Sequence, residues 1–256
     1  MKHAVKTERQ DNWCADFFDE AFADHYLERA PQHILAAVGF LTRHLQLAPG
    51  SRIFDQCCGV GNVSHALARM GHQLTGVDLI PGYIARAKKS AVAKDLSCDF
   101  YADDARVFKT PAPCDAAFNW WTSFGYFEDD AENRRMMERA ADSLKTGGLF
   151  VLDYMNRAER IASFGDKDVL VAQTPEGRWE SIFDRARDMV VKSWIYRDAA
   201  GNDVAKNGSG AKLYSPAQLQ RLLEQAGFKD VEFRGDWSGG PLTATSPRCI
   251  AIARKA

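Results

Sequence analysis

The amino-acid sequence predicts an α/β protein with a doubly wound, seven-stranded and mostly parallel sheet. Short apolar segments, typical of strands buried on both faces, alternate with segments of helical periodicity. Glycines follow the first of these apolar segments, immediately before a helix begins. The last two apolar segments are joined by a connection that is too short for a crossover helix. The final strand is therefore expected to run antiparallel, in a hairpin with the strand before it.

The N-terminal half supplies most of these elements. Residues 15–30 carry aromatic side chains on one broad side, and a second helix runs from Pro31 until Pro49 and Gly50 end it. The following strands are expected at residues 51–58, 71–79, 98–103, 114–121 and 148–155, with helices at 63–70, 84–95 and 131–145. The glycines at 147 and 148 are typical of a helix stop before the fifth strand.

The segment after the fifth strand has a different pattern. Residues 170–213 contain two stretches of alternating polarity, so we expect a small antiparallel insertion appended to the sheet. Ser215 caps a further helix, with Gln218 three residues later in a capping-box position. Strands at 229–237 and 246–255 form the terminal hairpin. This organisation predicts an N-terminal helical lid at residues 1–48 and a single α/β domain at residues 49–256.

The composition excludes several classes of protein. The 256 residues carry 33 Lys and Arg against 34 Asp and Glu, so the basic excess of a nucleic-acid binder is absent. No apolar run reaches the roughly 18 residues that a membrane span needs, and the N-terminus lacks a secretory signal pattern. The six cysteines show neither a disulfide framework nor zinc spacing. We therefore expect a cytoplasmic protein with a small-molecule substrate and no nucleic-acid, membrane or metal partner. The oligomeric state is not readable from the sequence.

A candidate ligand site lies where the apolar segments end. Asp55, Gly59 and Gly61 follow the first strand, and glycine lets the N–H groups of a helix N-terminus approach a ligand closely. Asp78 ends the second strand, where a carboxylate can accept hydrogen bonds from ribose hydroxyls, and Asp104 ends the third. Ligands of open α/β sheets bind at the carboxyl ends of the strands. These residues therefore predict a nucleotide-like cofactor.

The chain resembles the class I S-adenosylmethionine-dependent methyltransferases of small-molecule type over about residues 20–255. Its glycine loop is similar to the family signature (D/E)xxxGxG, and TGVDLIPGYIARAKK and YADDARVF resemble the second and third motifs. The resemblance implies a Rossmann-like methyltransferase fold, with S-adenosyl-L-methionine as cofactor and S-adenosyl-L-homocysteine as product. The cofactor-binding residues that it implies are Tyr26, Asp55, Cys57, Gly59, Gly61, Asn62, Asp78, Leu79, Asp103, Asp104, Ala105 and Asn119.

The resemblance also assigns individual roles. Asp78 is expected to hold the ribose and Leu79 to lie against the adenine face. Asp104 is expected to meet the adenine amino group, with Asp103 as the alternative because the register is uncertain by one residue. Tyr26 belongs to the N-terminal helix that closes over the methionine end of the cofactor in similar enzymes.

The residues after the fourth strand indicate the acceptor. The stretch from Asn119 to Thr122 lacks the (N/D)PP(Y/F) box of nucleic-acid base methyltransferases, and no histidine follows His72. We therefore expect methylation of an amine or amino-acid-like nitrogen, with O-methylation of a small metabolite as the alternative. Candidate catalytic residues are Tyr126 and His25, although His25 is better interpreted as an exposed helix residue. Candidate substrate-binding residues are Trp120, Trp121, Thr122, Ser123, Tyr154 and Trp237, and at least half of the aromatic rings near the site are expected to pack in the core.

Two other functions agree less well with the sequence. A nicotinamide or flavin oxidoreductase would carry GxGxxG, but Ser64 occupies the third glycine position. The fold of such an enzyme is also not expected to end in an antiparallel hairpin. A non-catalytic protein that binds S-adenosylmethionine as a sensor or scaffold is the second alternative, and the polar and aromatic stretch at 119–126 argues against it because it is suited to a substrate.

Overall fold

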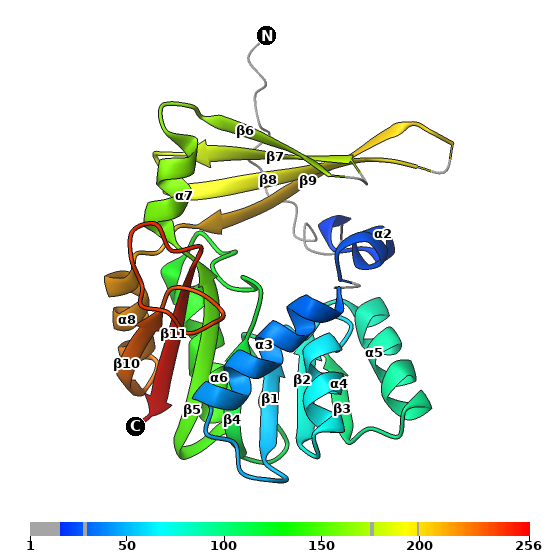
Figure 1. Ribbon diagram of the computed structural model, residues 1–256, viewed down its shortest axis with the longest axis vertical. Helices are drawn as coiled ribbons and strands as arrows, with labels where there is room; N and C mark the ends of the chain where they lie inside the picture. The colour runs from blue at the N-terminus through cyan, green and yellow to red at the C-terminus, as the bar shows by residue number, and fades with distance from the viewer. Residues whose placement is uncertain (1–15, 28–29, 175–176, 199) are drawn as a thin grey trace.

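The main sheet is a seven-stranded, mostly parallel sheet in the order β10-β11-β5-β4-β1-β2-β3 (Figure 1). This computed structural model describes residues 16–256 apart from 28, 29, 175, 176 and 199. The strands of this sheet are β1 (Arg52–Gln56), β2 (Gln73–Asp78), β3 (Cys98–Ala102), β4 (Cys114–Asn119), β5 (Leu144–Met155), β10 (Phe228–Arg234) and β11 (Arg248–Lys255). β11 runs antiparallel to both β5 and β10, whereas the other pairs are parallel. The predicted fold class and terminal hairpin are confirmed.

Helices bury both faces of this sheet. One face packs on α3 (Pro31–His44), α4 (Asn62–Arg69) and α5 (Pro81–Ala93), and the other on α6 (Asp130–Asp142) and α8 (Pro216–Gln225). Neighbouring residues of β1 pack on opposite faces of the sheet, because side chains alternate along a strand. Ile53 belongs to the cluster under α3 and α4, and Phe54 to the cluster under α6 and α8. None of the helices in the described ranges is long and apolar enough to cross a membrane.

One helix was missed from the sequence. α7 (Arg157–Phe164) follows β5 directly, and Asn156 is its N-cap because the Asn156 side chain accepts a hydrogen bond from the Ala158 N–H at 3.2 Å. Its single buried residue is Phe164, so eight residues give little periodicity from which to predict it. The capping box of Ser215 and Gln218 at the start of α8 is present as expected.

The antiparallel insertion forms a sheet of its own, which we call the second sheet. It contains β6 (Val169–Thr174), β7 (Gly177–Asp184), β8 (Met189–Arg197) and β9 (Asp203–Lys212), in that order. The expectation of antiparallel strands is confirmed, but their attachment to the main sheet is wrong. The second sheet lies beyond the carboxyl ends of β4 and β5 (Figure 1), and the Lys212 N–H donates to the Gly125 carbonyl in the loop after β4 at 2.9 Å.

The N-terminal segment lies between the two sheets. In place of one helix over residues 15–30, the structure has the short α2 (Glu20–Phe22) and the π-helical turn η1 (Ala23–Leu27). Phe22 packs with Trp194 of the second sheet, and Ala23 packs with Val60 of the main domain. Residues 1–15 of the predicted lid lie outside the described residues, and the division into lid and domain stays a prediction.

Candidate active site

The glycine loop, residues 57–61, connects β1 to α4. Gly59 and Gly61 have φ of 55° and 80°, in the left-handed region that glycine adopts without strain. A Cβ on Gly61 would lie 2.9 Å from Cζ of Phe100 and 3.2 Å from Cβ of Ala87, so only glycine fits there. Gly61 is also the N-cap of α4 and offers no side-chain acceptor to the helix. The N-terminus of α4 therefore remains available to polar groups of a ligand.

Asp78 supports this loop from the end of β2. Its carboxylate accepts the Gly59 N–H at 2.8 Å and the Ile80 N–H at 3.1 Å. Burial raises the pKa of Asp78, and these backbone hydrogen bonds oppose that shift. Each carboxylate oxygen has a further acceptor position, so ribose hydroxyls can still bind here. The neighbouring Leu79 side chain is 48% exposed, which suits a residue that covers a planar ring.

Asp55 lies behind the loop and is only 3% exposed. Its Oδ2 accepts a hydrogen bond from the Ser64 hydroxyl at 2.6 Å. Burial raises the pKa of Asp55 to about 7, the Ser64 hydrogen bond opposes this shift, and the charge of Asp78 adds to it. Ser64 occupies the position where an oxidoreductase fingerprint has its third glycine, and its hydroxyl gives that departure a structural purpose.

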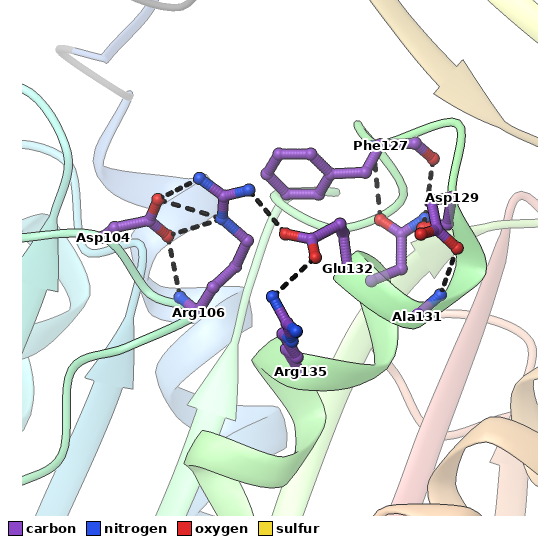
Figure 2. Close-up of polar contacts among 8 residues, drawn as sticks. Asp104, Arg106, Phe127, Asp129, Ala131, Glu132 and Arg135 are labelled. Atoms are coloured by element: carbon purple, nitrogen blue, oxygen red, sulfur yellow. Dashed lines mark hydrogen bonds and ion pairs between the residues drawn. The ribbon is translucent and has the colours of Figure 1, made fainter.

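The carboxylates after β3 have different partners. Arg106 holds the Asp104 carboxylate through its Nε at 2.9 and 3.0 Å, and its Nη1 continues to Glu132 of α6 at 2.7 Å (Figure 2). These hydrogen bonds lower the pKa of Asp104, although burial opposes them. Asp103 is exposed, and its carboxylate accepts the Asp104 N–H at 2.8 Å. Of the two alternatives for the adenine amino group, Asp103 is therefore the more accessible, and the buried Ala105 follows both.

Asn119 ends β4 next to the glycine loop. Its Nδ2 donates to Gln56 Oε1 at 3.3 Å and contacts the Cys57 sulfur at 3.8 Å. The Asn119 Oδ1 atom is buried and has no hydrogen-bond partner among the residues that the structure describes. Cys57 itself has φ 63°, and its Sγ donates to the Ser123 carbonyl at 3.8 Å. An unused buried amide oxygen at this point is an acceptor for an N–H group of a ligand.

The acceptor loop, residues 120–126, follows Asn119. Trp121 and Thr122 both have positive φ, 58° and 59°, and Asp153 of β5 holds their backbone. The Trp121 N–H donates to Asp153 Oδ2 at 3.1 Å and the Thr122 N–H to the Asp153 carbonyl at 3.0 Å. Trp121, Thr122 and Ser123 are all partly exposed. The structure therefore brings these three predicted substrate residues to the carboxyl end of β4, beside the glycine loop.

Three predicted substrate residues pack elsewhere. Trp120 is 3% exposed, and its ring contacts those of Phe40 of α3 and Trp237 with centroids 5.5 and 6.2 Å apart. Trp237 is partly exposed and packs against the same core cluster. Tyr154 is fully buried, and its hydroxyl donates to the Lys212 carbonyl. Neither Trp120 nor Tyr154 lines the site, because both rings complete the core on opposite faces of the sheet. Of the aromatic rings expected near the site, Trp120, Phe124, Tyr154 and Trp194 are buried and the others are partly exposed.

The two candidate catalytic residues come from different parts of the fold. Tyr126 is half-buried, and its ring contacts Phe18 with centroids 6.0 Å apart. His25 is exposed and its ring lies against Trp194 and Tyr196 of β8, at 5.4 and 6.0 Å. The exposure of His25 agrees with its interpretation as an exposed residue of the N-terminal segment.

The η1 turn covers the glycine loop. Asn62, the first residue of α4, donates its side-chain amide to the Leu27 carbonyl. A Cβ on Gly59 would lie 3.5 Å from Cδ1 of Leu27. Tyr26 packs between Trp179 and Trp194, with centroids 4.9 and 4.7 Å away. Tyr26 and Asn62 are therefore both part of the contact between the N-terminal segment and the rest of the site.

Two charged residues at the site, Arg248 and Lys192, were not predicted from the sequence. The fully buried Asp153 forms an ion pair with Arg248, 95 residues away, with Nε to Oδ1 at 2.7 Å. Lys192 of β8 has its pKa lowered to about 8 by burial and by the positive charges of Arg160 and Arg248. Neither the spacing nor the local pattern of these residues signals their proximity. Within the described ranges, no group of three or more His, Cys, Asp or Glu side chains is placed to hold a metal ion.

Comparison with known proteins agrees with this arrangement. Residues 53–148, which run from β1 into β5 and include the glycine loop, match the family model of the methyltransferase domain. A ubiquinone biosynthesis O-methyltransferase of Idiomarina loihiensis is 28% identical over 215 residues, which are 81% of this chain and 74% of the relative.

Solved structures share the fold over nearly the whole chain. The CcbJ methyltransferase of Streptomyces caelestis has a TM-score of 0.79 at 18% identity, covering 92% of this chain and 96% of its own. The amino pentose methyltransferase CalS10 of Micromonospora echinaspora, solved with S-adenosylmethionine bound, has a TM-score of 0.68 at 17% identity, covering 93% and 98%. The glycine loop, the acidic strand ends and the matching residues 53–148 identify an S-adenosylmethionine-dependent methyltransferase domain in this chain.

Proposed function

We propose that the protein transfers the methyl group of S-adenosylmethionine to the amine nitrogen of a small, amino-acid-like acceptor. The observation that carries this proposal is the position of the second sheet and the N-terminal segment beyond the carboxyl ends of the strands (Figure 1). A site covered from two directions suits a small molecule better than a nucleic acid or a folded protein. The near-neutral charge of the chain supports the same choice.

The chain's own residues account for binding of the cofactor. Asp78 would accept the ribose hydroxyls, Leu79 would cover the adenine, and Asp103 would accept from its amino group. The free Oδ1 of Asn119 would accept an N–H group beside the glycine loop. When bound, S-adenosylmethionine supplies a methyl group on a positively charged sulfur. The protein has only to align a nucleophile about 3 Å from that carbon and exclude water.

The placement of the histidines favours nitrogen as the acceptor atom. His33 and His44 lie on α3, His65 is buried on α4, and His72 precedes β2, so none of these four is on the acceptor loop. A neutral amine attacks the methyl group without a strong base, whereas many alcohols need one. CalS10 is named for an amino pentose, a small sugar that bears an amine. The Idiomarina relative, named as an O-methyltransferase, supports oxygen as the alternative.

A panel of acceptors tests the reaction. We expect amino acids and amino sugars to gain about 14 Da in the presence of S-adenosylmethionine, with fragmentation placing the methyl group on nitrogen. Phenols and carboxylic acids without an amine serve as matched controls. Transfer to oxygen only would overturn the choice of nitrogen. An absence of binding by S-adenosylhomocysteine in calorimetry would contradict the cofactor assignment itself.

Replacing Asp78 by alanine is expected to weaken S-adenosylhomocysteine binding by about 1 to 3 kcal/mol, because a charged acceptor for two ribose hydroxyls is lost. Isothermal titration calorimetry measures the change. Asp99 of β3 is an exposed carboxylate and provides the control, since Asp99→Ala should leave the affinity within twofold. Equal affinities of Asp78→Ala and the wild type would remove Asp78 from the cofactor site.

A further inference from the structure

The inward face of the second sheet carries a single lysine on β8 between two apolar contacts. Val190, Lys192 and Trp194 share one face of β8, because side chains alternate along a strand. Val190 belongs to the core cluster under α6 and α8, and Trp194 packs on Phe22 of the N-terminal segment; both are buried. Lys192 therefore faces the main sheet from the middle of this face.

The ammonium group of Lys192 lacks a counter-charge. Among the residues that the structure describes, it makes no hydrogen bond and no ion pair. The charges that act on it come from Arg160 of α7 and Arg248 of β11, and both are positive. The Nε atom of Arg160 is likewise buried without a hydrogen-bond partner within the described ranges.

Within the described residues, a single carboxylate forms an ion pair with this group of three cations. Asp153 accepts from Arg248 Nε, while Arg248 Nη2 donates to the Thr122 hydroxyl at 2.7 Å. The positive charges of Lys192 and Arg160 are left without compensation within the described residues, on side chains that are partly removed from water. Charges removed from water without a partner are costly, and apolar residues of similar size would pack there with less penalty. An anionic ligand would relieve that cost.

The position of these cations fits the acceptor rather than the cofactor. In the strand order, β5 and β11 lie on one side of β4, whereas β1 and β2, with the glycine loop and Asp78, lie on the other. Arg248 is at the start of β11 and contacts Thr122 of the acceptor loop. The cationic group is thus placed across the acceptor loop from the residues proposed to bind S-adenosylmethionine.

We propose that Lys192, Arg160 and Arg248 form a subsite for an anionic group of the acceptor, a carboxylate or a phosphate. This inference rests on the proposed amine methylation and deepens it, because it specifies an acceptor that carries both an amine and an anion. Holding the anion beside Thr122 fixes the acceptor at one end. Its amine is then free to approach the methyl group on the other side of β4, above β1.

Matched pairs of acceptors test the subsite. Each pair shares its amine and differs in the anion: an amino acid against its carboxamide, and phosphoethanolamine against ethanolamine. We expect wild-type kcat/KM to be at least about 10-fold higher for the anionic member of a pair. Preference in the first pair identifies a carboxylate and preference in the second identifies a phosphate. Equal kcat/KM for both members of both pairs would overturn the subsite and leave amine methylation standing.

Variants of Lys192 assign the effect to this residue. Lys192→Met should lower kcat/KM for the anionic member by about 10- to 100-fold, mainly through KM, and leave the neutral member within twofold. Lys192→Arg keeps the charge and should retain most of the preference. Lys229→Met removes an exposed lysine of β10 and should change neither. Equal losses on both members in Lys192→Met would contradict recognition of the anion.

Thermal stability gives a readout that is independent of any acceptor. Removing an uncompensated, partly buried charge should raise the Tm of Lys192→Met by about 2 to 4 °C, while Lys229→Met stays at the wild-type value. S-adenosylhomocysteine affinity of Lys192→Met should equal that of the wild type, because the lysine lies outside the cofactor residues. A lowered Tm would show that Lys192 already has a stabilising partner in the protein and would overturn the subsite. Failure of all acceptors together with failure to bind S-adenosylhomocysteine would instead overturn the proposed function.

Discussion

Arg248→Met is expected to destabilise the protein by about 3 to 5 kcal/mol, because it leaves a buried carboxylate without its cation. Asp153 is fully buried, and Arg248 Nε donates to its Oδ1 at 2.7 Å. Among the described residues, the Trp121 N–H at 3.1 Å is the other donor to this carboxylate, and a single neutral donor does not compensate the charge. Urea-induced unfolding, followed by circular dichroism, measures the difference.

Two further variants separate the ion pair from the packing of β11. Arg254 lies on the same strand, half-buried, and donates to the Gly147 carbonyl at 2.9 Å, so Arg254→Met should cost less than about 1 kcal/mol. The double variant Arg248→Met with Asp153→Leu removes both charges and should recover much of the loss. If Arg248→Met were no more damaging than Arg254→Met, Asp153 would not depend on its ion pair.

Asp55 is expected to make the free energy of unfolding fall as the pH rises from about 4 to 7. Its pKa rises from 3.8 to about 7 in the folded protein, so the folded state binds more protons than the unfolded chain in this range. The stability that Asp55 contributes is complete below pH 3.8 and is lost as the pH passes through 7. A shift of this size corresponds to at most about 4 kcal/mol. Asp78, whose pKa is also raised, adds to the same slope.

Asp55→Asn tests this expectation because asparagine can still accept from the Ser64 hydroxyl but cannot ionise. Unfolding in urea at pH 5, 6, 7 and 8 should show a flatter pH dependence for this variant and greater stability than the wild type at pH 8. Asp99→Asn on β3 changes an exposed carboxylate and should follow the wild type. Parallel curves for Asp55→Asn and the wild type would mean that Asp55 ionises at its ordinary pKa.

The fold was largely predictable because each strand and helix of the main sheet carries a local signal. The glycine loop, Asp55 and Asp78 were found in the same way, since they follow directly from the ends of apolar segments. The directions of single rings were not predictable, because strands buried on both faces are apolar throughout. Trp120 and Tyr154 were therefore predicted to bind the substrate, although both side chains pack in the core.

Other features depend on contacts that are distant in the chain. The sequence around Lys192 is that of an ordinary alternating strand. Its position near Arg160 of α7 and Arg248 of β11 follows only from the tertiary structure. The pairing of Asp153 with Arg248 depends on the register of β5 against β11, where Asp153 stands opposite Ile250. The π turn at η1 depends on packing against Trp179 and Trp194 rather than on its own periodicity. The separate second sheet likewise follows from tertiary packing.

The η1 turn links two parts of the site that a modular description would treat as independent. Through Leu27 and Asn62 it is attached to the glycine loop, and through Tyr26 it is attached to the second sheet. In this protein the second sheet is therefore not an interchangeable specificity module. Grafting a foreign second sheet onto this domain, in order to change the acceptor, would remove the surface on which η1 rests and would alter the cofactor loop as well.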